Sequence, residues 1–459
     1  MTQDTALSIL QTGANVFLTG EPGSGKTHTI NRYVAWLRER GIEPAITAST
    51  GIAATHIGGS TIHSWSGIGV QKGLSPADID ALTQKEHVVR RVARTPVLII
   101  DEISMLDGRT LADVDAVLRS MRHPTLPFGG VQVVFVGDFF QLPPVSTNES
   151  REMPGELLFE EESHTAFAFM ASAWKQANPI VCYLSEQHRT DDPVFLDILS
   201  SLRRGTLTED HRETLRSRQS EPKEEAVTRL YSHNASVDRI NLTELSRLSG
   251  KEYRFTMQEK GSEKLTAGLK KHCLSPEVLI LKEGARVMFT KNSFEQGFVN
   301  GTLGVVTSLS RTGDPVVTTR AGKKITVSRA DWHVMHEGKP LATISQYPLR
   351  LAWAITVHKS QGMSLDAACM DLSTAFEYGQ GYVALSRVRT LQGLFLLGAN
   401  ERALEVHPDV AEADETFRSL SDVAEETFDR MGETERCALS DRFVKACGGT
   451  LPKKKPVRA

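Results

Sequence analysis

The 459-residue sequence lacks the features of a membrane protein, a secreted protein or a metal-binding scaffold. No apolar run approaches the roughly 20 residues that a membrane-spanning helix needs, and residues 1–4 lack the basic and apolar regions of a signal peptide. The five cysteines are scattered and form no C-x-x-C pair, so neither a zinc site nor a disulfide framework is indicated. We therefore expect a globular cytoplasmic protein without membrane association.

A strong net charge is also missing, because the formal net charge is only −3. The charge is unevenly distributed: residues 401–436 carry twelve acidic and four basic side chains, whereas residues 437–459 carry one acidic and six basic ones. The remainder is neutral, so a polyanion would have to bind in a local groove rather than in a general positive field. The acid-rich stretch predicts a solvated pair of helices, or alternatively a docking surface or an autoinhibitory mimic of a polyanionic strand.

The sequence does contain a phosphate-binding loop. Residues 20–27 read Gly-Glu-Pro-Gly-Ser-Gly-Lys-Thr, the pattern G-x-x-x-x-G-K-T. Glycines in this pattern let backbone N–H groups surround phosphate oxygens, while the lysine reaches the β and γ phosphates and the threonine hydroxyl binds Mg²⁺. An apolar run over residues 15–19 and helical spacing over residues 29–40 predict the strand–loop–helix context that this site needs. The residues expected to bind ATP are Gly20, Gly23, Ser24, Gly25, Lys26 and Thr27, and the alternative is a glycine-rich turn that resembles the motif by chance.

Two further strand ends carry polar residues that suit ATP hydrolysis. Residues 97–102 form an apolar strand that ends in two carboxylates, of which Asp101 would hold Mg²⁺. Glu102, which strand alternation would point the other way, would polarise the attacking water. Residues 133–145 predict another strand and a stiff turn that holds Gln141 near the γ-phosphate. Taken alone, each would more often be a solvated turn or a plain surface loop.

Strand and helix patterns alternate along the chain, which predicts an α/β fold with helices on both faces of a parallel sheet. A second, shorter set of strands follows, and it is interrupted by short strand-like runs that suggest an inserted small β-barrel. The first set covers residues 16–19, 45–48, 97–100, 131–136 and 180–184; the second covers 227–231, 352–356 and 394–397; the short runs are 287–290, 304–306, 315–318 and 324–327.

Together these motifs resemble those of superfamily 1B helicases, above all the petite-integration-frequency (PIF) type and its RecD-like relatives. The resemblance covers about residues 1–400 and is specific, because ordinary P-loop switches lack motifs V and VI. Motifs I, II and III correspond to residues 20–27, 101–105 and 137–145, and motifs Ia, IV, V and VI to residues 47–54, 186–189, 349–362 and 382–389.

The resemblance implies two RecA-like P-loop domains, an SH3-like β-barrel inserted in the second, and a helical C-terminal tail. The implied bounds are residues 1–184 for the first domain (1A), with a short wedge (1B) near 66–80; 185–248 and 344–400 for the second (2A); 249–343 for the insert (2B); and 401–459 for the tail.

The resemblance also implies roles for individual residues. Arg189 and Arg387 would reach the γ-phosphate from the second domain, although a single arginine is usually a surface residue and these two rest on motif context. Gln3 would read the adenine edge. Trp65 would stack on a base, or else pack in a small core. The residues expected to contact DNA are Ser49, Thr50, Gly51, His63, Trp65, Thr356, His358, Lys359 and Ser360.

The implied function is that of an ATP- and Mg²⁺-dependent DNA helicase. It would move 5′ to 3′ on single-stranded DNA as a monomer, act at junctions of single- and double-stranded DNA, and serve DNA repair, recombination or genome maintenance. G-quadruplex DNA is a further implied substrate. Two alternatives stay open: a P-loop ATPase that remodels a protein without nucleic acid, and an RNA-directed helicase.

Overall fold

The chain divides into two units. Unit 1 comprises Met1–His188 and Pro408–Ala459, and unit 2 comprises Arg189–His407. In the described residues, no helix is both long and apolar enough to cross a membrane. The computed structural model describes residues 1–56, 59–69, 73–144, 167–186, 192–221, 227–231, 234–291, 293, 295–298, 300–319, 322–336, 339–357 and 360–451.

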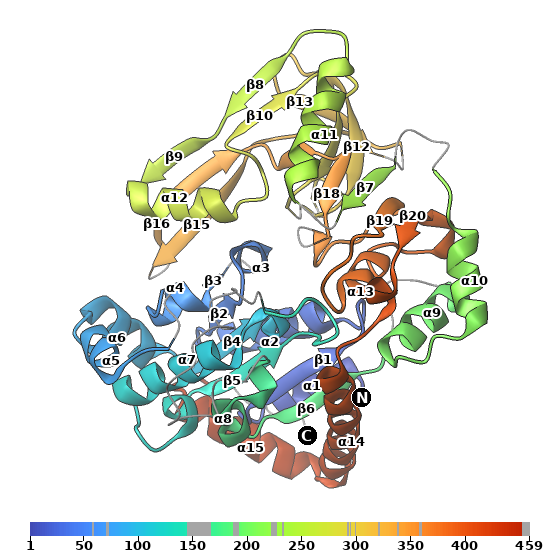
Figure 1. Ribbon diagram of the computed structural model, residues 1–459. Helices are drawn as coiled ribbons and strands as arrows, with labels where there is room; N and C mark the ends of the chain where they lie inside the picture. Colours follow the sequence, from blue (N-terminus) through green and yellow to red (C-terminus); the bar gives the residue numbers. More distant parts are fainter. Residues whose placement is uncertain are drawn as a thin grey trace, which may run out of the picture. The chain divides into compact units, whose positions relative to one another are not determined.

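Unit 1 is built on a sheet whose described strands follow the order β3-β2-β4-β5-β1-β6 (Figure 1). Neighbouring strands pair in parallel throughout these residues. Most are short apolar runs, as strands buried on both faces require. The strands are β1 (Val16–Gly20), β2 (Ala45–Ala48), β3 (Ser60–Thr61), β4 (Val97–Asp101), β5 (Gln132–Val136) and β6 (Ile180–Leu184). The strands expected in this part of the chain are therefore confirmed, and β3 is additional.

Helices cover both faces of this sheet, as alternation along β1 requires. Val16 and Leu18 belong to a core shared with the first two helices, whereas Phe17 faces the other way, with its ring 5.0 Å from that of Trp174. The helices are α1 (Gln3–Leu10), α2 (Lys26–Arg38), α3 (Gly51–His56), α4 (Ile62–Ser66), α5 (Pro76–Thr83), α6 (Glu86–Arg94), α7 (Gly108–Met121) and α8 (Ser172–Ala177). Helix α2 begins three residues earlier than expected, and α5 falls in the segment expected to form the wedge, of which residues 70–72 lie outside the described ranges.

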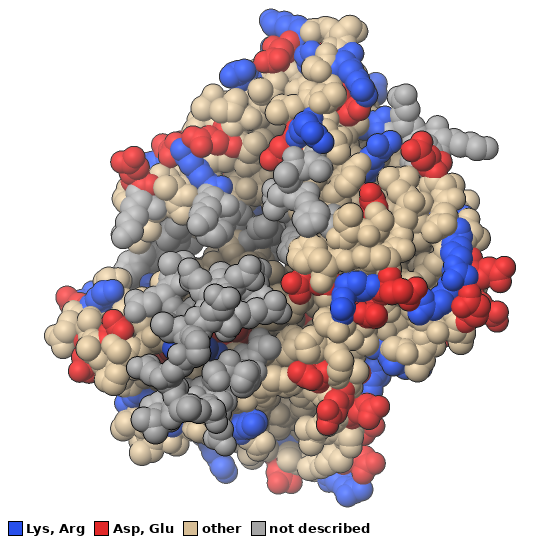
Figure 2. Space-filling view, viewed as in Figure 1, with Lys and Arg blue, Asp and Glu red and all other residues tan. Residues whose placement is uncertain are grey.

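The acid-rich C-terminal segment forms α14 (Pro408–Arg430) and α15 (Glu433–Ala446), which pack on unit 1. Phe428 and Val444 lie in the same core as Leu18, and the Ser421 hydroxyl accepts a hydrogen bond of 3.0 Å from the Tyr183 amide in β6. The expected pair of helices is present, but one of its faces is buried rather than solvated. On the face shown in Figure 2, acidic and basic side chains are interspersed, in keeping with the small net charge.

Unit 2 contains a second parallel sheet, whose described strands follow the order β18-β7-β19-β20. Three of these strands match the sequence-based expectation, and β19 is additional. The strands are β7 (Thr228–Tyr231), β18 (Ala354–Thr356), β19 (Ala368–Leu372) and β20 (Leu394–Ala399); the helices are α9 (Pro193–Arg203), α10 (Glu209–Ser217), α11 (Asn234–Arg247) and α13 (Gln380–Leu385).

Between β7 and β18 in sequence lies an antiparallel sheet with the strand order β14-β13-β12-β11-β17 among the described residues. Its inward-facing Val287, Val306 and Val317 are fully buried. It comprises β11 (Arg286–Phe289), β12 (Leu303–Leu309), β13 (Pro315–Thr319), β14 (Lys324–Thr326) and β17 (Leu349–Leu351). Around it are β8 (Tyr253–Thr256), β9 (Gln258–Gly261), α12 (Glu263–His272), β10 (Val278–Leu281), β15 (Ala330–His336) and β16 (Lys339–Gln346). The four short strands expected here are present, and the likeness to an SH3 barrel stays a prediction.

Candidate nucleotide and nucleic-acid site

The sequence motifs of unit 1 meet at one edge of its sheet. Because β1, β2, β4 and β5 run in parallel, the segments that follow their carboxyl ends share that edge. These segments are the phosphate-binding loop after β1, Ser49 after β2, the carboxylates that end β4, and Gln141 after β5. In open sheets of parallel strands, ligands usually bind outside the carboxyl ends of the strands, at the point where the order of the strands reverses.

The phosphate-binding loop has the backbone that an anion site requires. Gly20, Gly23 and Gly25 have φ of 141°, 95° and 89°. At Gly25 the left-handed conformation directly precedes Lys26, the first residue of α2, and no side chain caps this helix. The amides of its first turn are therefore available to an anion, and the helix dipole favours negative charge there.

Polar side chains of the loop also fit phosphate. The Ser24 side chain is 1% exposed, and its hydroxyl has no hydrogen-bond partner among the described residues. The Lys26 ammonium donates hydrogen bonds to the carbonyls of Gly20 (2.7 Å) and Glu21 (3.1 Å), which curl it over the loop. Thr27 is exposed in the first turn of α2. This buried donor, the ammonium and the uncapped helix amides together suit a polyphosphate.

Asp101 ends β4 beside the loop. Burial raises the pKa of its carboxyl, and this effect is opposed by a hydrogen bond from the Glu102 amide (2.9 Å) and by the positive charge of Lys26. A carboxylate close to the loop lysine is suited to hold a cation bound to phosphate. Among the described residues no group of three or more His, Cys, Asp or Glu side chains could hold a metal ion.

Glu102 does not belong to the strand. Its φ of 51° and ψ of 46° are left-handed, and it begins a short 3₁₀ turn over Ile103–Met105. The direction of its carboxylate is therefore set by this turn, and the expectation that strand alternation sets it is wrong. Residues that bear a side chain adopt this conformation seldom, and such residues cluster at functional sites.

Gln141 is held by the loop that follows β5. The Asp138 carboxylate accepts a hydrogen bond from the Phe140 amide (3.2 Å), and the Asp138 carbonyl accepts one from the Gln141 amide (3.0 Å). Asp138 is fully buried and Gln141 is 7% exposed. A Cβ atom on Gly137 would lie 3.0 Å from the Ile103 amide, so this loop packs directly against the turn that begins at Glu102.

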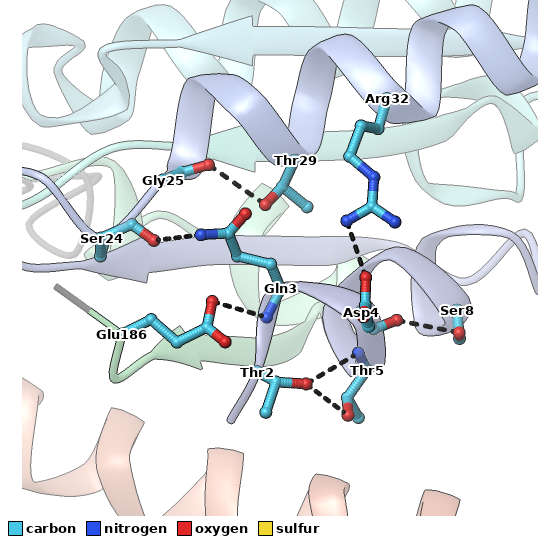
Figure 3. A network of polar contacts seen from close by, with 10 residues as sticks. All are labelled: Thr2, Gln3, Asp4, Thr5, Ser8, Ser24, Gly25, Thr29, Arg32 and Glu186. Atoms are coloured by element: carbon cyan, nitrogen blue, oxygen red, sulfur yellow. Dashed lines mark hydrogen bonds and ion pairs between the residues drawn. The ribbon is translucent and has the colours of Figure 1, made fainter. Parts of the chain in front are cut away.

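Gln3 lies against the phosphate-binding loop (Figure 3). Its Nε2 donates to the Ser24 carbonyl (3.3 Å), and a Cβ atom on Gly25 would lie only 2.2 Å from Nε2. Its backbone amide donates to the Glu186 carboxylate (3.4 Å). No sequence pattern predicted the Glu186 contact, because it depends on β6 ending next to the start of α1. Gln3 thus adjoins the loop, and contact with adenine stays a proposal.

The residues of unit 1 expected to contact DNA occupy different environments. Ser49 is 7% exposed, and its hydroxyl donates to the Glu102 carbonyl (2.7 Å). Thr50 accepts a hydrogen bond at its hydroxyl from the Ala53 amide (3.3 Å) and directly precedes Gly51, the first residue of α3. His63 is half-buried in α4. Trp65 is 5% exposed, which favours packing in the core over stacking on a base.

In unit 2, Thr356 and Ser360 are 1% and 0% exposed, so their hydroxyls lie in the interior rather than on a surface that phosphodiesters could reach. The Ser360 hydroxyl donates to the Val357 carbonyl (2.7 Å). The expectation that these two hydroxyls contact DNA directly does not match this placement. His358 and Lys359 lie between them in sequence, and they, like Arg189, lie outside the described residues.

Arg387 is 1% exposed and is bound within unit 2. Its Nε donates to the Val383 carbonyl (2.8 Å) and one Nη to the Ser386 hydroxyl (2.8 Å). The other Nη lies 3.5 Å from the Ser360 carbonyl and 3.4 Å from that of Met363. The guanidinium therefore joins motif VI to motif V inside the unit, and a contact with ATP stays a proposal.

The chain is similar to known proteins over nearly its whole length. The family model described as "PIF1-like helicase" matches residues 3–213, and the model of the "DNA helicase Pif1, 2B domain" matches residues 264–309. The ATP-dependent DNA helicase Pif1 of a Psychrobacter species is 41% identical, over 99% of this chain and 76% of that relative.

Solved structures agree with this match. Bacteroides Pif1 in complex with ADP-AlF4 superposes with a TM-score of 0.78 at 30% identity, over 91% of this chain and 96% of that one. Bacteroides Pif1 in complex with ADP-AlF3 and ssDNA has a TM-score of 0.61 at the same identity and coverage. With these likenesses and the phosphate-binding edge of unit 1, the chain belongs to the PIF1-like helicases.

Proposed function

We propose that this chain is an ATP-dependent DNA helicase that moves 5′ to 3′ on single-stranded DNA. One observation carries the proposal: a phosphate-binding loop with Lys26 close to Asp101 lies in a chain that is 41% identical to a Pif1 helicase over 99% of its length. The activity follows from the family to which the chain belongs. The direction of movement rests on the motif resemblance and needs its own test.

Residues of unit 1 divide the work on ATP. Lys26 and the first amides of α2 bind the phosphates, and Thr27 with Asp101 hold Mg²⁺, which neutralises phosphate charge when bound. Glu102 takes a proton from the attacking water, a role worth about 10²–10⁴ in rate. Gln141, next to the Glu102 turn, senses the γ-phosphate.

Three further residues complete the proposed nucleotide site. Gln3, packed on the loop, reads the adenine edge. Arg387 and Arg189 stabilise charge on the γ-phosphate, which is worth roughly 10³–10⁵ in rate for an arginine in that role. For both arginines the proposal rests on motif resemblance. For Arg387 it also requires the guanidinium to exchange its carbonyl partners for phosphate oxygens.

Thr50, Gly51 and His63 are the proposed contacts of unit 1 with DNA, and His358 and Lys359 those of unit 2. Their hydroxyl, amide, imidazole and ammonium groups suit phosphodiester oxygens rather than base edges, so binding is independent of sequence. A solved Bacteroides relative contains single-stranded DNA together with a nucleotide analogue, which supports single strands as the substrate.

Several finer properties belong to the same proposal. The chain works as a monomer in the cytoplasm, associated with the nucleoid if the source is bacterial, and it acts on junctions of single- and double-stranded DNA and on G-quadruplexes. It serves DNA repair, recombination or genome maintenance. The insert of unit 2 is an SH3-like barrel, supported by the match of its residues 264–309 to the 2B domain model.

The decisive experiment measures ATP turnover with and without oligo-dT, followed by unwinding of matched 5′-tailed, 3′-tailed and quadruplex substrates. We expect strong stimulation by oligo-dT, loss of activity in EDTA, unwinding of the 5′-tailed duplex but not of the 3′-tailed one, and unwinding of the quadruplex. Turnover that ignores oligo-dT would indicate the protein-remodelling ATPase instead. Faster unwinding with an RNA tracking strand than with DNA would indicate an RNA-directed motor.

A further inference from the structure

Ser49 joins the loop after β2 to the end of β4 through both of its polar groups. Its backbone amide donates a hydrogen bond of 3.1 Å to the Asp101 carbonyl, and its hydroxyl donates one of 2.7 Å to the Glu102 carbonyl. The strand register explains this, because Ala48 pairs with Asp101 and the next residue along β2 therefore lies beside Glu102. Ser49 is 7% exposed, so its hydroxyl lies in the interior of unit 1.

The carbonyl that Ser49 binds belongs to the residue whose backbone is left-handed. Glu102 has φ of 51°, a conformation that is unfavourable for a residue with a side chain and must be held by its surroundings. Its carbonyl accepts hydrogen bonds from the Ser49 hydroxyl and from the Met105 amide (3.1 Å). Because these bonds fix the peptide that follows Glu102, they also fix the direction in which its side chain leaves the backbone.

The other end of the same loop faces the proposed DNA contacts. Thr50 directly follows Ser49, and Gly51, two residues after Ser49, begins α3. A phosphodiester that binds Thr50 or Gly51 therefore lies within two residues of Ser49, whose hydroxyl is bonded to the Glu102 carbonyl. The Ser49 hydroxyl is bonded to the backbone carbonyl of Glu102, and this placement does not match the expectation that Ser49 contacts DNA itself.

We propose that Ser49 is a positioning residue: its hydroxyl holds Glu102 in the hydrolytic orientation and transmits the binding of a single strand at Thr50–Gly51 to that carboxylate. This inference rests on the proposed function, because it assigns the residue through which DNA stimulates ATP hydrolysis. This role does not require Ser49 to contact ATP, Mg²⁺ or DNA.

The chain provides a matched control two residues earlier. The hydroxyl of Thr47 donates a hydrogen bond of 2.7 Å to the Ile99 carbonyl, between the same two strands, and its side chain is fully buried. Thr47→Val and Ser49→Ala each remove one buried hydroxyl–carbonyl bond of equal length. Only the second bond reaches the turn of Glu102, so a loss that merely reflects weaker strand packing would appear in both variants.

The experiment compares the full-length wild type, Ser49→Ala, Ser49→Thr and Thr47→Val for thermal unfolding, oligo-dT affinity and ATP turnover over a range of oligo-dT concentrations. We expect Ser49→Ala to lower the turnover at saturating oligo-dT by about five- to tenfold, the size of one hydrogen bond. Its affinity for oligo-dT and its KM for ATP should change less than about twofold. Ser49→Thr, which keeps the hydroxyl, should restore most of the turnover, and Thr47→Val should match the wild type.

Other outcomes would overturn the inference. If Ser49→Ala weakens oligo-dT binding and leaves the saturated turnover intact, Ser49 is a DNA contact. If Thr47→Val loses as much turnover, or Ser49→Thr as much as Ser49→Ala, the bond serves packing alone. A wild type that oligo-dT does not stimulate would instead refute the proposed function, and this result is read from the wild type before any variant is compared.

Discussion

The backbone amide of Tyr183 in β6 donates a hydrogen bond of 3.0 Å to the hydroxyl of Ser421 in α14, across 238 positions of sequence. The Tyr183 ring also lies under the guanidinium of Arg418, 4.3 Å from its centre. An acid-rich helix near the end of the chain is thus bonded to an edge strand of the nucleotide-binding sheet. The contribution of this helix to the stability of unit 1 can be measured directly.

Phe428→Ala should destabilise unit 1 because Phe428, only 6% exposed, packs in the core that contains β1 and α2. We expect a cost of about 3 kcal/mol, which corresponds to a melting temperature roughly 6–12 °C lower for a unit of this size. Differential scanning calorimetry would measure it. Val423→Ala on the same helix is the matched control, because Val423 is 60% exposed and should change stability by less than about 0.5 kcal/mol. Equal effects of the two variants would contradict the packing described for α14.

Lys26→Ala should lower ATP turnover more than about 100-fold, since it removes a charge aimed at the developing phosphate charge. Binding of oligo-dT, measured by fluorescence anisotropy without nucleotide, should stay within about threefold of the wild type because the Lys26 ammonium is turned onto the carbonyls of Gly20 and Glu21 in the phosphate-binding loop. Loss of oligo-dT binding as complete as the loss of turnover would show that the loop also forms part of the DNA site.

Glu102→Gln should retain ATP binding and lose hydrolysis, because the amide keeps the shape of the carboxylate and cannot accept a proton. We expect turnover to fall by about 10²–10⁴ and the affinity for a fluorescent ATP analogue to stay within about threefold. Single-turnover hydrolysis separates the two quantities. Normal hydrolysis by this variant would transfer the role of base to another residue.

Gln3→Ala should weaken discrimination between ATP and GTP, if the amide that packs on Gly25 also reads the adenine edge. The loss of one or two hydrogen bonds predicts a rise of about fivefold in KM for ATP, with KM for GTP unchanged. Ser8→Ala in the same helix is the control, since its hydroxyl donates to the Asp4 carbonyl within α1. An equal rise for both nucleotides would limit Gln3 to supporting the loop.

Thiol alkylation should report the packing of unit 1. Burial raises the pKa of Cys182 to about 12 and that of Cys447 to about 11, whereas Cys437 is exposed. Because the thiolate is the reactive form, Cys182 should react very slowly at pH 8, and its rate should rise with pH. Mass spectrometry after brief treatment with iodoacetamide should find Cys437 modified first. Early modification of Cys182 would contradict the burial of β6.

The sequence predicted the strands of unit 1 well, because each is a short apolar run between a loop and a helical pattern. It missed β19 (Ala368–Leu372), whose residues have little intrinsic preference for strands. That strand forms because it pairs with β7 on one side and β20 on the other, and such pairing is a tertiary effect. The buried face of α14 was missed for a similar reason, since its few apolar residues stand among many acidic ones.

The phosphate-binding part of the site could be predicted from the sequence, because the glycines around Lys26 form a motif that is typical of phosphate binding. Contacts that depend on a neighbouring strand could not be predicted from the local sequence pattern. The hydroxyl of Ser49 reaches Glu102 only because Ala48 and Asp101 are in register. Trp65 and Ser360 were both expected to contact DNA, and only the packing around them shows that both are buried.

Unit 1 is assembled from two separate stretches of chain, with all of unit 2 between them. In topological terms unit 2 is an insertion into unit 1, joined by two covalent connections rather than one. A single proteolytic cut in either connection would leave the two units linked through the other. A shortened protein that ends near residue 407 would lose part of the ATPase core, not an appendage, whereas unit 2 is one continuous stretch of chain.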